Sequence, residues 1–143
     1  MLTGSLPELL EHKLIALDTS KAVSLDSSTD THIHTTMQNR FVHNVFFWLK
    51  NPASTEDAKA LVTGIRTLFD VPTVQDAHLG KPAPTDRSVI DNTYSYHLML
   101  TFASLEDQNT YQLHPIHLTF VDDCAHLWDK VLVYDSDSSL LDN

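Results

Sequence analysis

The sequence predicts a single α+β domain in which helices pack against a four-stranded antiparallel sheet. Two observations predict this class. Segments rich in β-branched and aromatic residues alternate with segments whose apolar residues recur at helical spacing, in the order β-α-β-β-α(α)-β. The first strand also carries bulky apolar side chains on both faces, and such a sheet must be covered on both sides.

The composition limits the classes of function. The 143 residues suffice for one domain with a core, and a content of 42% hydrophobic and 20% charged residues is ordinary for a globular protein. The net charge of −10 argues against nucleic acid and against an anionic membrane surface as partners. No segment is apolar enough to span a bilayer and the first residues lack a secretory signal, which together predict a cytoplasmic protein.

The one cysteine, Cys124, cannot form an internal disulfide, so packing alone must stabilise the fold. It lies on the apolar stripe of a predicted helix. We therefore expect Cys124 to be a small core residue rather than a nucleophile.

Residues 1–39 differ in composition from the rest of the chain and are predicted to be a flexible N-terminal extension. Leucines at helical spacing over Leu6–Leu17 indicate a short amphipathic helix. Asp18–Asn39 is rich in Ser, Thr and Asp, so it cannot bury enough apolar surface to offset the entropy of ordering. The pair at His32–His34 is at most a weak metal site, and Met37 could be an alternative start.

The compact domain is expected over residues 40–135, beginning with a strand over Phe41–Leu49. Its period of two places one set of side chains on one face (His43, Val45, Phe47 and Leu49) and another set on the other (Val42, Asn44, Phe46 and Trp48). Because both faces are largely apolar and helices can cover only one, the other face predicts a homodimer in which two sheets meet.

Local patterns predict the elements in the middle of the domain. Ser54, followed by Asp57 three residues later, is typical of a helix N-cap, and apolar residues at helical spacing continue that helix to about Phe69. Strands are predicted over Thr73–Leu79 and Thr93–Phe102, with a polar, proline-containing loop over residues 81–92 between them.

A proline divides the helical segment that follows. Ser104 caps a helix predicted over Leu105–Leu113, and Pro115 must interrupt it because proline lacks a backbone N–H and clashes with the preceding turn. A second helix begins near Pro115, with an apolar stripe expected to run as far as Trp128. A strand over Val131–Tyr134 completes the ferredoxin-like order, and residues 136–143 are predicted to be a loose C-terminal tail.

The break at Pro115 places two candidate functional residues close together. Tyr111 falls in the last turn of the first helix, and His117 falls in the first turn of the second. A side chain in that first turn projects from a helix end, which suits a group that lines a cavity. Taken alone, however, a histidine near a helix start is more often a surface or satisfied core residue, and a lone tyrosine is more often a packing residue.

The residues of the domain resemble the stress-responsive A/B barrel (Dabb) family over roughly residues 40–135. The resemblance rests on His43 with its apolar strand and Lys50, on Arg87, on the strand from Tyr94 to Phe102, on Tyr111 with His114-Pro115-Ile116-His117, and on the ending Val131-Leu132-Val133-Tyr134-Asp135. It implies two subunits whose four-stranded sheets form a shared barrel, with a cavity in each subunit between sheet and helices.

The resemblance also implies candidate catalytic residues. One plant member is a polyketide cyclase that closes a linear poly-ketone chain by aldol condensation, and its working histidine and tyrosine correspond to His117 and Tyr111. A histidine on its first strand corresponds to His43. A neutral imidazole can take a proton near the working pH and a phenol can donate a hydrogen bond to the developing oxyanion, so no cofactor and no metal is predicted. His43, His114 and His117 could instead gather a divalent ion.

Three functions remain open on the sequence. The first is a homodimeric barrel protein that binds a small apolar or aromatic molecule. The second is a cofactor-free lyase or cyclase with His117 as general base and Tyr111 as hydrogen-bond donor. The third is a structural or stress-protective assembly role, which no residue specifies.

Overall fold

The computed structural model describes residues 39–142, and this part of the chain is one compact unit. Four predictions fall outside the described residues. They are the flexible extension over residues 1–39, of which only Asn39 is described, the helix over Leu6–Leu17, the histidine pair at His32–His34 and the alternative start at Met37.

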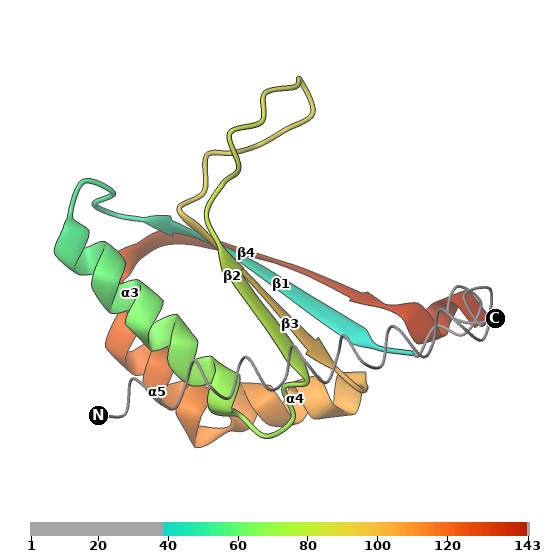
Figure 1. The fold of residues 1–143 in the computed structure, drawn as a ribbon. Coiled ribbons are helices and arrows are strands. Elements are labelled where there is room, and N and C mark those ends of the chain that lie inside the picture. The colour runs from blue at the N-terminus through green and yellow to red at the C-terminus, as the bar shows by residue number, and fades with distance from the viewer. Residues whose placement is uncertain (1–38, 143) are drawn as a thin grey trace, which may run out of the picture. The chain divides into compact units, whose positions relative to one another are not determined.

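The order of elements confirms the predicted fold class (Figure 1). The strands are β1 (Phe41–Leu49), β2 (Asp76–Gly80), β3 (Tyr96–Phe102) and β4 (Trp128–Asp137), and the α-helices are α3 (Thr55–Thr67), α4 (Leu105–Leu113) and α5 (Pro115–Cys124). Three short 3-10 helices complete the order, namely η1 (Leu68–Asp70), η2 (Ala125–Leu127) and η3 (Ser138–Asp142). The strands form one antiparallel sheet in the order β2-β3-β1-β4.

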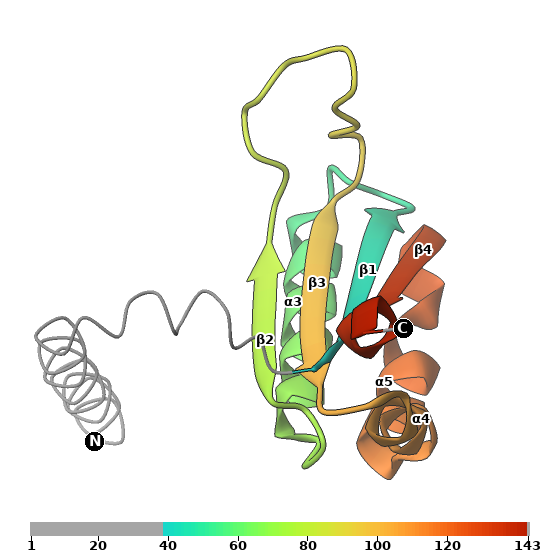
Figure 2. The same cartoon turned by 90° about the vertical axis from the view of Figure 1, so that its right-hand side faces the viewer.

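All three α-helices lie on the same face of the sheet (Figure 1), and Figure 2 shows α3 behind β2 and β3. On β1 the alternation is complete: residues from Phe41 to Leu49 are in turn buried under the helices and half-buried on the open face. The core combines this helix-side set with apolar side chains of β3 and the helices (among them Leu61, Ile65, Leu98, Leu100, Phe102 and Phe120). The predicted division of β1 into two faces is therefore confirmed.

Side-chain caps begin the helices where the sequence predicts. Ser54 Oγ accepts from the backbone N–H of Asp57 at 3.1 Å, and Ser104 Oγ accepts from that of Asp107 at 3.1 Å. His114 caps α5, because its Nδ1 accepts from the Ile116 N–H at 3.0 Å. Each cap satisfies an N–H that the first turn of a helix leaves without an intrahelical partner.

Two strand boundaries differ from the prediction. β3 begins at Tyr96 rather than Thr93, because Asp91 Oδ1 accepts from both the backbone N–H of Thr93 (2.9 Å) and its hydroxyl (2.6 Å) and so folds the chain into a turn. β2 begins at Asp76 rather than Thr73, because the chain after Pro72 first closes a turn. The loop between these strands projects well beyond the sheet (Figure 1).

The helix after Pro115 is shorter than its apolar stripe suggests. α5 ends at Cys124, η2 follows, and Trp128 opens β4 opposite Leu49 instead of continuing the helix. The backbone N–H of Lys50 donates to the carbonyl of Leu127 at 2.9 Å, which ties this corner to the end of β1. Tertiary pairing with β1 thus overrides the local helical pattern.

Cys124 is buried, as predicted for a small core residue, and burial raises the pKa of its thiol. Its position depends on a close approach of α5 to α3. A side chain at Gly64 of α3 would collide with Cys124 Sγ, so α3, α5 or the Cys124 side chain would have to shift to admit it.

The last strand is longer than predicted at both ends. β4 spans Trp128–Asp137, with a register irregularity at Trp48/Leu49, and η3 follows directly. Ser136 and Asp137, which were expected to begin a loose tail, are strand residues paired with Val42 and Phe41. No helix in the described part of the chain is long and apolar enough to cross a membrane.

Candidate functional site

A cavity of about 160 Å³ lies between the helix-side face of the sheet and the helices, and it brings the three predicted site residues together. His43 comes from β1, Tyr111 from the last turn of α4 and His117 from the first turns of α5. The other lining residues are mostly apolar: Val45, Phe47, Leu68, Leu98, Gln112, Phe120, Val121, Trp128, Val131 and Val133.

The rings of the three residues form a chain of contacts. The centroids of Tyr111 and His117 are 4.9 Å apart, and those of His43 and Tyr111 are 5.8 Å apart. Phe102 lies behind Tyr111 at 5.2 Å and holds the phenol ring from the β3 side. Tyr111 is therefore central to the cluster and is only 1% exposed.

The backbone around Pro115 fixes the tautomer of His117. His117 Nδ1 lies 3.0 Å from the backbone carbonyl oxygen of Gln112. A carbonyl can only accept, so Nδ1 carries the hydrogen and the lone pair of the neutral ring is on Nε2. This contact exists because the proline turn leaves the end of α4 facing the start of α5.

Electrostatics favours the neutral form of His117 and the protonated form of Tyr111. Burial lowers the pKa of His117, the hydrogen bond to Gln112 raises it, and the charge that His43 can carry lowers it further. Burial raises the pKa of the Tyr111 phenol far above its usual value. The cavity thus presents an imidazole base beside a phenol that remains a hydrogen-bond donor.

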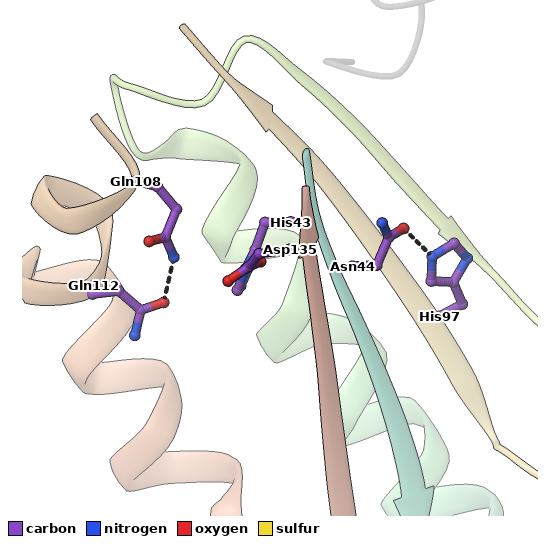
Figure 3. A network of polar contacts seen from close by, with 6 residues as sticks. All are labelled: His43, Asn44, His97, Gln108, Gln112 and Asp135. Carbon is purple, nitrogen blue, oxygen red and sulfur yellow. Dashed lines mark hydrogen bonds and ion pairs between the residues drawn. The ribbon is translucent and has the colours of Figure 1, made fainter. Parts of the chain in front are cut away.

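His43 is held by a carboxylate that the sequence reasoning missed. Its Nδ1 lies 2.6 Å from Oδ1 of Asp135, which is directly opposite on β4. An ionised carboxylate only accepts, so Nδ1–H donates and the ring is oriented by the strand pairing (Figure 3). The sequence shows only that Val131, Val133 and Asp135 share one face of the last strand. The register that places Asp135 opposite His43 comes from the pairing of β1 with β4.

A second missed feature is a pair of amides on α4. Gln108 is buried (5% exposed) and its Nε2 donates to Oε1 of Gln112 at 2.8 Å, as Figure 3 shows. The two residues are four apart on one helix, a spacing that places side chains over one another. That spacing was visible in the sequence, but the direction of the side chains toward the cavity was not.

His114, the third histidine of the metal alternative, does not join the site. Its Nδ1 is used as the N-cap of α5, accepting from Ile116 N–H. Within residues 39–142, no group of three or more His, Cys, Asp or Glu side chains is arranged to hold a metal ion.

A larger hollow lies elsewhere, between α3 and α5. It measures about 840 Å³ and is lined by residues such as Lys59, Thr63, Ile116 and Asp123. None of the three predicted site residues lines it. The smaller cavity is therefore the candidate functional site, because the phenol of Tyr111 and the imidazoles of His43 and His117 line it.

Comparison with known proteins identifies the family. Residues 41–138 match the family model described as Stress responsive A/B Barrel Domain. The chain belongs to this family. The match covers most of the 143 residues and confirms the resemblance that the strand and His-Pro-x-His patterns predicted.

Individual proteins of the A/B barrel family and of the same fold share low sequence identity with this chain. Olivetolic acid cyclase of Cannabis sativa is 29% identical over 65 residues, which make up 46% of this chain and 62% of the cyclase, so less than two thirds of the cyclase is spanned. A family protein of ferredoxin-like fold from Mesorhizobium loti is 25% identical, with a TM-score of 0.58 over 69% of this chain and 96% of that chain.

A dimeric ferredoxin-like protein from Thermobifida fusca has a TM-score of 0.56, with 14% identity over 70% of this chain and 92% of that chain. This likeness concerns the fold alone. Together with the Mesorhizobium loti structure, it confirms the ferredoxin-like architecture of the A/B barrel domain.

Proposed function

We propose that the protein is a homodimeric A/B barrel protein whose cavity binds a small apolar or aromatic molecule. The observation that carries this proposal is the lining of the cavity. Apolar side chains form most of its wall, and the polar groups are few and convergent (His43, Tyr111, Gln112 and His117). A largely apolar pocket with a small number of convergent polar groups is typical of small-molecule sites.

The size and the opening of the cavity limit the ligand. A volume of about 160 Å³ is close to that of an apolar protein cavity known to admit benzene, so one aromatic ring with a small substituent fits. Val121, Val131 and Val133 line the cavity and are nevertheless 37–43% exposed. They mark its entrance between α5 and the edge strand β4, and an apolar rim favours an apolar ligand.

Thermal unfolding in the presence of small aromatic compounds tests this proposal. A ligand that binds only the folded state should raise the melting temperature as the ligand concentration increases. At one hundred times its Kd, the ligand adds about 2.7 kcal/mol to the free energy of unfolding. Val45→Trp, which fills the cavity from β1, should remove the shift while Val62→Trp on α3, outside the cavity lining, should not. A broad screen without any stabilising ligand would argue against a binding function.

A second function, a cofactor-free cyclase or lyase, is favoured by one specific observation: the rings of His117 and Tyr111 lie 4.9 Å apart in the cavity, and His117 Nε2 makes no hydrogen bond within residues 39–142. Burial favours the neutral imidazole and the protonated phenol. In an aldol closure, His117 Nε2 takes a proton from the carbon between two carbonyls. The resulting enolate carbon attacks a further carbonyl of the same chain, forming the C–C bond while the C=O π pair moves to oxygen. Tyr111 donates a hydrogen bond to that oxyanion, and the imidazolium returns the proton to it.

His117→Ala should abolish turnover of a linear poly-β-keto substrate and leave the fold intact. His126→Ala is the matched control, because His126 is exposed and does not line the cavity. Product formation followed by chromatography gives the rate. Undiminished turnover in the His117 variant would remove this residue from the mechanism.

The homodimer is supported by the open face of the sheet. Aromatic side chains gather there: Phe46 stacks on His97 with ring centroids 4.5 Å apart, meets Tyr94 at 5.0 Å and meets Tyr134 at 6.3 Å. Tyr134 is 62% exposed in one subunit. A second sheet packed across a two-fold axis would remove this surface from water, in agreement with solved proteins of the same fold that are described as dimeric.

A further inference from the structure

The amide of Gln112 is oriented by a neighbour within its own helix. Gln112 lines the cavity, and its Oε1 accepts from Nε2 of the buried Gln108 at 2.8 Å. Because Oε1 is engaged, the amide cannot turn freely, and its Nε2–H₂ group is fixed as a donor. No group within residues 39–142 accepts from Gln112 Nε2.

The polar groups of the cavity are gathered at one end. Figure 3 shows the Gln108–Gln112 amides and the His43–Asp135 pair on the side of the sheet that α4 covers, opposite Asn44 and His97. His117 joins this end, since its Nδ1 donates to the backbone carbonyl of Gln112. Phe47 lies four residues along β1 from His43, toward the end where Trp128 pairs with Leu49, and its ring contacts those of Phe120 and Trp128. The cavity is therefore polar at one end and apolar at the other.

We propose that Gln112, held by Gln108, is a specificity-determining residue that donates a hydrogen bond from Nε2 to an acceptor oxygen of the ligand. This inference rests on the proposed binding function and deepens it by naming the ligand class. The ligand is an aromatic or apolar molecule that carries a carbonyl or a comparable acceptor oxygen at one end. A pure hydrocarbon would leave the fixed amide donor desolvated and unpaired, which is unfavourable.

The backbone and the side chain of Gln112 have separate roles, and this makes the proposal testable. The backbone carbonyl orients His117 and is present whatever the side chain is. A substitution at position 112 therefore removes the amide donor without removing the contact that fixes the His117 tautomer. Gln112 is half-buried on the last turn of α4, and Gln112→Glu keeps an acceptor for Gln108 Nε2, so the fold should tolerate at least that change.

Two ligands of matched shape isolate the hydrogen bond. Acetophenone and α-methylstyrene differ only in whether oxygen or a CH₂ group is doubly bonded to the same carbon. Their Kd values are measured by calorimetry for the full chain, and the ratio of the α-methylstyrene Kd to the acetophenone Kd is compared between variants. Taking a ratio removes effects of cavity size that are common to both ligands.

Gln112→Met keeps the length of the side chain and lacks the donor, so the ratio should fall about twofold to tenfold, as expected for the loss of one neutral hydrogen bond. Gln112→Glu presents only acceptors, so acetophenone should be disfavoured at least as strongly. Gln108→Leu releases the amide and should lower the ratio by a smaller factor. Gln75→Met is the control, because Gln75 is exposed and lies outside the cavity lining.

The outcomes separate this inference from the function on which it rests. If both ligands bind and the ratio is unchanged in Gln112→Met and Gln112→Glu, the specificity role is wrong and the binding function stands. If neither ligand binds the wild-type protein, both are overturned. A fall in the ratio at position 112 but not at position 75 would establish the role of Gln112.

Discussion

The assembly can be tested by a single substitution at Phe46. The ring of Phe46 lies on the open face of the sheet between His97 and Tyr94, whereas the next residue, Phe47, points into the core and is 2% exposed. Phe46→Asp therefore alters the surface that we propose to join two subunits. The same change at position 47 would instead place a charge among the buried side chains of one subunit.

The magnitude follows from burial. A large apolar side chain withdrawn fully from water contributes about 1.5–3 kcal/mol. Because Phe46 is already half-buried within one subunit, about half of this belongs to the dimer contact, or about 2 kcal/mol over the two copies. Burying two carboxylates adds about 2 kcal/mol or more for each. A total of about 6 kcal/mol weakens association about ten-thousand-fold.

Sedimentation and thermal melts at two concentrations measure the effect. The wild-type melting temperature should rise with protein concentration, because dissociation and unfolding are coupled. Phe46→Asp should give unfolded or aggregated chain, and Phe46→Leu, which keeps an apolar side chain, should remain a dimer. A folded wild-type monomer of 16.1 kDa at micromolar concentration would refute the two-sheet assembly.

The helix crossing and the buried histidines give two further predictions. Gly64→Ala should destabilise the domain by about 1–3 kcal/mol in urea unfolding, because the new Cβ collides with Cys124 Sγ; combining it with Cys124→Ala should recover part of this loss, and full additivity would contradict the collision. Burial lowers the pKa of both His97 and His117, so the unfolded chain binds more protons. The contribution of these two histidines to the free energy of unfolding is thus fully present above about pH 6.5 and is lost as the pH falls through their lowered folded-state pKa values. His97→Asn should make the free energy of unfolding depend less on pH in this range. If the free energy of unfolding of His97→Asn changed with pH as steeply as that of the wild type, His97 would not contribute to the pH dependence.

The order of elements could be predicted because local patterns and tertiary packing agree in most of the chain. The alternation on β1 and the caps at Ser54 and Ser104 are local features, and the structure confirms each. The predicted end of α5 was wrong because the apolar stripe continues to Trp128, which belongs to strand β4 and not to the helix. No local pattern distinguishes these two uses, since the deciding contact is the pairing of Trp128 with Leu49.

The candidate site was predicted only in part, for a similar reason. Tyr111 and His117 are close in sequence, so the turn at Pro115 was enough to bring them together. Asp135 is distant in sequence from His43, and their contact depends on the register between β1 and β4, which the sequence alone did not provide. Gln112 was overlooked because a glutamine on a helix is ordinarily a solvated residue.

The central claim is that the cavity formed by His43, Tyr111 and His117 is a ligand site. Nuclear magnetic resonance of the imidazole nitrogens, during titration with acetophenone, tests it most directly. We expect His117 to be neutral with the hydrogen on Nδ1, and the signals of His43 and His117 to move with ligand concentration while those of the exposed His126 stay fixed. If the His43 and His117 signals do not move, or if His126 moves equally, the cavity is not the site.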